Sequence, residues 1–135
     1  MSTMVTRVVH LSIERDWQSV YRFASDPKKM PLWASGLASG LTPDGEDWLA
    51  TGLLGAVHIR FAPPNGYGVI DHTVTLGSGL RVHNALRVVP NGDGCEVIFM
   101  LLRLAGMTDA QFDADAVHVA KDLATLKSMM ENAIG

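Results

Sequence analysis

Two consecutive expected strands each carry one polar side chain of a kind that could bind or transform a ligand. His72 alternates with apolar residues on one face of the first strand, and Asn84 does so on the second. The segment that joins them is Gly77-Ser78-Gly79. A three-residue loop places His72 opposite Asn84 and matches the two apolar faces, whereas a two-residue loop would place His72 opposite His83.

A histidine beside an amide within an apolar surface has three interpretations. The pair could satisfy its own hydrogen bonds inside the core. It could instead form the polar part of a cavity wall and orient a carbonyl or hydroxyl group of a ligand. The imidazole of His72 could also act as a general acid or base, with His83 as the second catalytic candidate. Asp71 alternates to the opposite face, expected toward solvent, so we do not expect it to orient His72.

Other candidates for ligand contact are one cation and several large apolar side chains. Arg103 ends the last expected strand, where it could anchor an anionic ligand, cap a helix end or pair with Asp109. Trp33 and Trp48 offer apolar surface and one N–H donor each, at the rim of a cavity or in the core. Adaptable packing around a ligand could come from Met100, Met107, Met129 and Met130. The predicted contact set is His72, Asn84, Trp33, Trp48, Phe99, Arg103 and Leu123.

The histidines and the single cysteine form no recognisable metal or redox motif. No two of the five histidines lie at helical i, i+4 spacing or in an HxH strand pattern. Cys95 has no basic neighbour in the sequence to activate its thiol, and one cysteine excludes an internal disulfide. We therefore expect no metal and no other cofactor, and a structural role for Cys95.

The composition narrows the class of protein. The chain has 135 residues, 47% of them apolar, which is typical of one globular domain, here residues 1–135. A net charge of −3 argues against binding nucleic acid through its phosphates. The longest apolar run, 97–102, is too short to span a bilayer, and no signal peptide is recognised. We expect a cytoplasmic protein without stable membrane insertion, and a homodimer is left open.

The elements that must position these side chains follow a clear order. A first strand spans 5–13, and Asp16 caps a short helix. Asp26 and Pro27 begin a second short helix that ends near Trp33. Turn-forming residues then separate six β-rich runs, at about 37–42, 46–53, 55–62, 67–76, 80–89 and 95–104. This spacing is typical of an antiparallel meander, so the sheet has seven strands with the first one included.

The last segment predicts a long amphipathic helix. Thr108 and Gln111 form a capping box at its start. Apolar residues then recur at spacings of four and three, at Phe112, Ala116, Val119, Leu123, Leu126 and Met130. This apolar stripe must be buried, and the sheet is the only large partner. We therefore expect an α+β helix-grip fold, with a curved sheet around the C-terminal helix and a cavity where the two diverge.

This order of elements and several motifs resemble the superfamily of START-like domains. The resemblance covers nearly the whole chain. It rests on the opening strand, on Asp16-Trp17-Gln18-Ser19-Val20-Tyr21-Arg22-Phe23, on Ser25-Asp26-Pro27 and on Asp122-Leu123-Ala124-Thr125-Leu126-Lys127. Tyr67-Gly68-Val69-Ile70-Asp71-His72 and Val82-His83-Asn84 look like a bacterial branch of that group. The superfamily includes the Bet v 1-type plant allergens, the polyketide cyclase/dehydrase and lipid-transport proteins, and the coenzyme Q-binding proteins.

The resemblance implies a protein that binds a small hydrophobic molecule of lipid, polyketide or aromatic type. One alternative is an enzyme of the cyclase or dehydratase type that acts on a polyketide-like substrate. A second alternative is an interaction module whose cavity is filled and whose surface does the work. The residues offer no acid–base pair beyond His72 and His83, which favours binding over catalysis.

Overall fold

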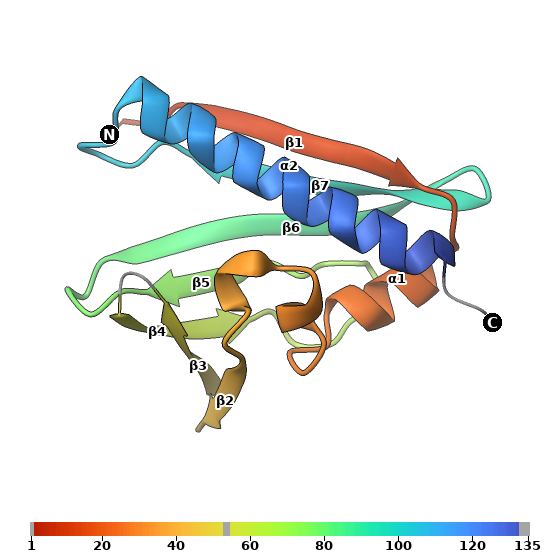
Figure 1. The fold of residues 1–135 in the computed structure, drawn as a ribbon, viewed down its shortest axis with the longest axis horizontal. Coiled ribbons are helices and arrows are strands. Elements are labelled where there is room, and N and C mark those ends of the chain that lie inside the picture. Colours follow the sequence, from red (N-terminus) through yellow and green to blue (C-terminus); the bar gives the residue numbers. More distant parts are fainter. Residues whose placement is uncertain (1, 53–54, 133–135) are drawn as a thin grey trace.

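The chain folds as a curved antiparallel sheet that lies against one long helix (Figure 1). The computed structural model describes residues 2–52 and 55–132. The elements in chain order are β1 (Thr6–Ile13), α1 (Trp17–Ala24), the 3-10 helices η1 (Met30–Leu32) and η2 (Ser35–Leu37), β2 (Leu41–Asp44), β3 (Asp47–Gly52), β4 (Gly55–Phe61), β5 (His72–Thr75), β6 (Arg81–Asn91), β7 (Gly94–Leu102) and α2 (Asp109–Asn132). The strand order β1-β7-β6-β5-β4-β3-β2 confirms the predicted seven-stranded sheet and helix-grip fold.

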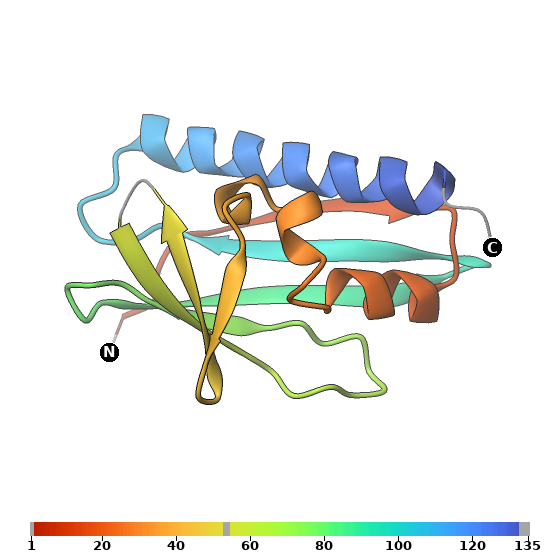
Figure 2. The same cartoon turned by 60° about the horizontal axis from the view of Figure 1, so that its bottom comes forward.

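Helix α2 buries five of the six residues of the predicted stripe against the inner face of the sheet, and the sixth, Val119, is half-buried. The capping box is formed, with Thr108 N–H donating to Gln111 Oε1 at 2.9 Å and Gln111 N–H donating to Thr108 Oγ1 at 3.1 Å. The helix lies along β1 and β7, and the η1–η2 segment stands on the same side of the sheet (Figure 2). The buried side chains of the helix are Phe112, Ala116, Leu123, Leu126 and Met130. Within the described residues, no helix combines the length and the apolar character needed to cross a bilayer.

The segment between α1 and β2 differs from the prediction. Asp16 caps α1 as expected, because its Oδ2 accepts the Ser19 N–H at 2.9 Å. After Asp26 the chain forms a turn and two separate 3-10 helices instead of one continuous helix that ends near Trp33. Pro31 cannot donate a backbone hydrogen bond and disfavours helical geometry in the preceding residue. Tight i, i+3 turns still place both Met30 and Trp33 in the core.

Two strand predictions also need correction. The run 37–42 is not a strand at its start, because Leu37 ends η2 and β2 begins at Leu41. The run 67–76 forms regular strand only over His72–Thr75. Upstream of β5, two backbone hydrogen bonds still join this segment to β6: Ile70 N–H to Leu86 O at 2.8 Å, and Val88 N–H to Gly68 O at 2.9 Å.

The side chain of Asp71 takes the place of some backbone hydrogen bonds in this irregular segment. Its Oδ1 accepts Leu86 N–H and Arg87 Nε–H, both at 3.0 Å, and its Oδ2 accepts Arg87 Nη2–H at 2.7 Å. The side chain lies opposite to that of His72, as predicted. It is not solvated, however: only 15% of it is exposed, because Arg87 covers it. Asp71 therefore joins the start of β5 to β6.

The Asp71 ion pair makes part of the stability dependent on pH. Hydrogen bonding from Arg87 holds the pKa of the Asp71 carboxyl below its usual value, and Leu86 N–H adds to the effect. A carboxyl whose pKa is lower in the folded state stabilises the fold above its unfolded pKa of about 4, and this stabilisation is lost as the pH falls through the folded pKa. We expect Asp71→Asn to lower the free energy of unfolding at pH 7 by about 1–3 kcal/mol.

Urea denaturation between pH 2 and pH 7 tests this expectation. The difference between the wild type and Asp71→Asn should shrink as the pH falls below about 4, because protonation then removes the charge in the wild type as well. The exposed Asp93 supplies the control, and Asp93→Asn should leave the stability unchanged at every pH. A loss for Asp71→Asn that does not vary with pH would contradict the role of the carboxylate charge.

Candidate functional site

A cavity of about 220 Å³ lies between the sheet, α2 and the η1–η2 segment. The sheet lines it with Ile59, Phe61, His72, Val74, Asn84, Leu86 and Phe99. Helix α2 adds His118, Val119, Asp122 and Leu123, and the segment 30–37 adds Met30, Trp33, Ala34, Gly36 and Leu37. The volume is just below the range of roughly 300–1,000 Å³ that is usual for small-molecule sites. The cavity therefore has the mainly apolar wall of a small-molecule site and a volume that suits only a compact ligand.

Five members of the predicted contact set meet in this cavity, and two do not. The five are His72, Asn84, Trp33, Phe99 and Leu123. Trp48 lines a separate hollow beside Tyr21 and Arg60. Arg103 forms an ion pair with Asp109, and its Nε–H donates to Met107 O at 3.1 Å. The guanidinium of Arg103 is thus paired inside the protein, as in the alternative that it binds Asp109.

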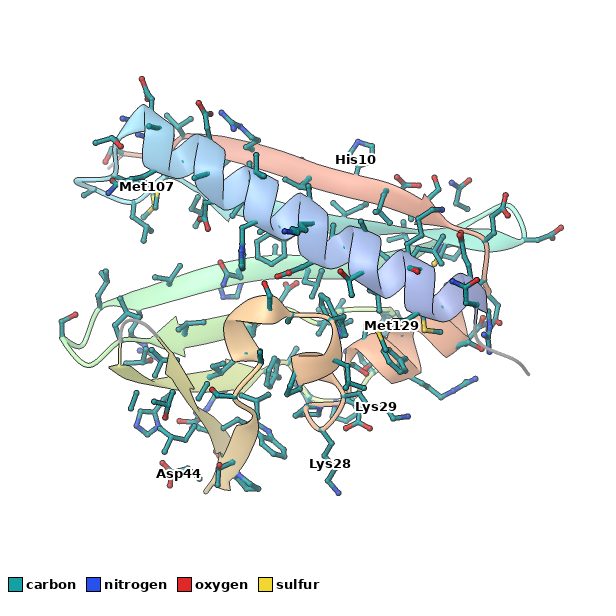
Figure 3. All side chains as sticks on the ribbon, in the orientation of Figure 1. His10, Lys28, Lys29, Asp44, Met107 and Met129 are labelled. Atoms are coloured by element: carbon teal, nitrogen blue, oxygen red, sulfur yellow. The ribbon has the colours of Figure 1, made fainter. Side chains whose placement is uncertain are left out.

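The methionines that the sequence suggested for ligand packing do not line the cavity either. Met107 and Met129 lie near opposite ends of α2 (Figure 3). Met100 pairs with Val8 in the β1–β7 ladder, and Met130 belongs to the buried core. The cavity is lined instead by Met30, which the sequence analysis did not single out.

The predicted register of β5 and β6 is confirmed, and it places His72 opposite Asn84. Asn84 Nδ2 lies 3.4 Å from His72 Nε2, so the two side chains form the expected polar pair. The rings of Phe61 and Phe99 lie on either side of the imidazole, with centroids 5.4 and 6.3 Å from its own. The alternative register, with His72 opposite His83, is wrong. His83 lies on the other face, with its Nδ1 3.2 Å from Thr73 Oγ1.

Hydrogen bonds determine which nitrogen of His72 carries a proton. Nδ1 lies 3.0 Å from Ile70 O, and a carbonyl oxygen can only accept, so the hydrogen is on Nδ1. Desolvation by burial lowers the pKa of His72, which favours the neutral ring. Nε2 is then an acceptor and receives the Asn84 N–H. His72 therefore has no proton to offer to the interior of the cavity.

Asn84 is the side chain of the pair that keeps hydrogen-bonding capacity. A primary amide has two N–H donors and one oxygen acceptor. One N–H of Asn84 is directed at His72, and its Oδ1 and second N–H have no partner within the part of the chain that the structure describes. His72 thus orients the amide, and Asn84 presents both a donor and an acceptor at the cavity wall.

Trp33 adds a donor that the protein itself leaves unsatisfied. The residue lines the cavity and is only 6% exposed. Its indole Nε1 is buried and has no acceptor within residues 2–52 and 55–132. A buried donor without an acceptor costs about 1–3 kcal/mol. Trp33 therefore lines the cavity as a residue, and its N–H is a buried donor without an acceptor in the described chain.

A polar cluster that the sequence analysis missed ties η2 to α2 at the side of the cavity. Ser35 donates to Asp122 Oδ1 twice, from its N–H at 3.2 Å and from its Oγ–H at 2.8 Å. His118 Nε2 lies 3.3 Å from Ser35 Oγ and 3.4 Å from Asp122 Oδ2. In a nucleophilic triad the hydroxyl and the carboxylate contact opposite ring nitrogens, whereas here both lie near the same one. The cluster therefore fastens the η1–η2 segment over the cavity.

The remaining candidates are structural. Cys95 is 1% exposed, and burial raises the pKa of its thiol to about 11, which agrees with the predicted structural role. Among the described residues, no group of three or more His, Cys, Asp or Glu side chains is placed to hold a metal ion.

Comparisons with known proteins agree with this architecture. No protein-family model matches the chain, and no curated protein matches it by sequence. The Aha1 dimer from Colwellia psychrerythraea has a TM-score of 0.77 at 13% identity, over 98% of this chain and 100% of its own. DynU16, from the dynemicin biosynthetic locus, has a TM-score of 0.73 at 12% identity over 94% of this chain; the match spans 47% of DynU16, about half its length.

A third solved structure shows the same likeness. Ara h 8.0201 superposes with a TM-score of 0.68 at 10% identity, over 96% of this chain and 99% of its own. The resemblance that the sequence motifs indicated is therefore confirmed at the level of the fold. The protein has the helix-grip fold of the Bet v 1-like and START-like proteins.

Proposed function

We propose that the protein binds a small hydrophobic molecule, of lipid, polyketide or aromatic type, in the cavity between α2 and the sheet. The observation that supports this most is the unused hydrogen-bonding capacity of Asn84 in a mainly apolar wall. A core that only stabilises the fold gains nothing from an unfilled cavity or from unpaired polar groups. A ligand with an apolar body and one carbonyl or hydroxyl group would fill the cavity and pair with the amide.

The geometry favours binding over the cyclase or dehydratase alternative. Such a reaction needs a side chain that exchanges a proton with the substrate. His72 has its proton on the nitrogen bound to Ile70 O, and His83 lies on the other face of the sheet. The interaction-module alternative assumes a filled interior, whereas this interior holds a cavity of about 220 Å³. Catalysis by a cyclase or dehydratase and recognition through the surface are therefore the two alternatives against which ligand binding is tested.

The substitution Asn84→Leu tests the proposal, because leucine has a similar size and no polar group. We expect the affinity for naphthol to fall by about 1–3 kcal/mol in the variant, since the hydroxyl loses its partner in a buried site. The affinity for naphthalene should stay the same or rise. Both affinities can be measured by displacement of the fluorescent probe N-phenylnaphthylamine.

The control is His83→Leu, a change in the same strand on the opposite face of the sheet, which should leave both affinities unchanged. Two results would overturn the proposal: a wild-type protein that takes up neither the probe nor the two compounds, or an equal loss for naphthol and naphthalene. Chemical conversion of a bound polyketide-like compound would instead favour the cyclase or dehydratase alternative.

A further inference from the structure

A second hollow adjoins the cavity beyond η2. It has a volume of about 860 Å³ and is bounded by η2, the strands β3 to β5 and the first half of α2. Its floor is apolar, with Ala50, Val57, Val74 and Leu76 among its residues. The cavity and this hollow share Gly36, Val74 and His118 in their walls. The two spaces therefore adjoin along these three residues.

Gly36 is the residue without a side chain where the two spaces adjoin. It belongs to η2, and a Cβ atom added to it would lie 3.9 Å from His118 Nε2. The residue does not have a positive φ, so a larger side chain is compatible with its backbone. Such a side chain would extend into the passage between η2 and α2. A larger side chain at this position would thus narrow the space that a ligand reaching both hollows has to pass.

The ionisable side chains in the walls of the two spaces are two aspartates and two histidines. Asp115, Asp122, His72 and His118 are the ionisable side chains in their walls, and no lysine or arginine of the described chain lines either space. Asp122 is held by Ser35 and lies near His118. Asp115 is half-buried at the hollow and has no hydrogen bond or ion pair with any described residue. A carboxylate without a partner beside an apolar wall attracts a cation and repels an anion.

We propose that the cavity and the second hollow form one elongated site for a hydrophobic amine. The apolar body lies in the cavity and passes Gly36, and the protonated amine pairs with the Asp115 carboxylate. The free donor and acceptor of Asn84 can pair with an oxygen of the ligand at the wall of the cavity. This inference rests on the proposed function, and it adds the charge and the length of the ligand.

Three probes with the same alkyl chain test the charge: decylamine, decanol and decanoate, each titrated calorimetrically at pH 7 into the full chain below its micellar concentration. We expect decylamine to bind about tenfold more tightly than decanol, because a hydrogen-bonded ion pair replaces a neutral contact, and decanoate to bind most weakly. Asp115→Asn should abolish the preference for the amine and leave decanol within about twofold. Asp113→Asn is the control, because Asp113 lies on the exposed side of α2 and pairs with Arg7, and it should keep the preference.

The substitution Gly36→Leu tests whether the ligand extends from the cavity into the second hollow. It should weaken decanol and decylamine by about tenfold more than it weakens naphthol, which fits inside the cavity. If decanol binds but decylamine binds no more tightly, or if Asp115→Asn keeps the preference, the inference is wrong and the proposed function stands. If none of the three probes binds and naphthol does not bind either, both fail.

Discussion

The substitution Gly68→Ala is expected to lower the free energy of unfolding by about 2–5 kcal/mol. Gly68 has a φ of +73°, a left-handed conformation that an alanine adopts only with strain. An added Cβ would also lie 2.0 Å from Val88 O, a backbone atom of β6. Val88 N–H donates to Gly68 O at 2.9 Å, so the two segments cannot separate without losing this hydrogen bond. Neither the strain nor the clash can be relieved by a change of rotamer.

Gly66→Ala is the matched control, because it lies two residues away and an added Cβ there has no heavy atom within 4 Å. Its φ is not positive, so we expect a change within about 0.5 kcal/mol. Urea denaturation of the two variants at pH 7 measures the difference. An equal loss in both variants would show that the close approach of Gly68 to β6 does not support the fold.

Shortening Leu123 to alanine is expected to cost about 2–5 kcal/mol of unfolding free energy. Leu123 is 1% exposed, belongs to the main core and also lines the cavity. Removal of its methyl groups loses apolar burial and leaves space that the long helix and the hydrogen-bonded sheet cannot fill. The effect follows from the position of the residue in the stripe of α2.

Val117→Ala in the same helix serves as the reference. Val117 is 67% exposed, and alanine is the better helix former, so the variant should be within about 0.5 kcal/mol of the wild type or slightly more stable. Thermal and urea denaturation give both values. A loss below about 0.5 kcal/mol for Leu123→Ala would mean that the stripe is not buried.

The register of β5 and β6 shows why part of the site was predictable. The two strands are joined by a short loop, and only one register places the apolar side chains of both on the same face. The His72–Asn84 pair follows from this register. The capping box and stripe of α2 were predictable for a similar reason, because each depends on residues three or four positions apart.

Asp71 and Arg103 show where the same reasoning failed or stayed open. The alternation of β5 indicated that Asp71 faces away from His72, but it could not show that Arg87 covers the carboxylate. For Arg103 the sequence allowed an anion site or the Asp109 pair, and the structure has the pair. Trp48 lies on the inner face of the sheet, opposite Ile59, yet outside the cavity. The alternation of residues along a strand shows on which face of the sheet each side chain lies. The position of the residue along the curved sheet decides what that side chain contacts.

The sequence by itself determined the order of the elements, the buried face of α2 and the inward polar pair, because these depend on short spacings and on the need to bury apolar faces. The tertiary structure alone decided that Ser35, His118 and Asp122 meet, and that Gly36 lines both the cavity and the hollow beside Asp115. Ser35 and Asp122 are 87 positions apart. Their contact depends on how far the sheet curves around the helix, and no periodicity in the chain encodes that curvature.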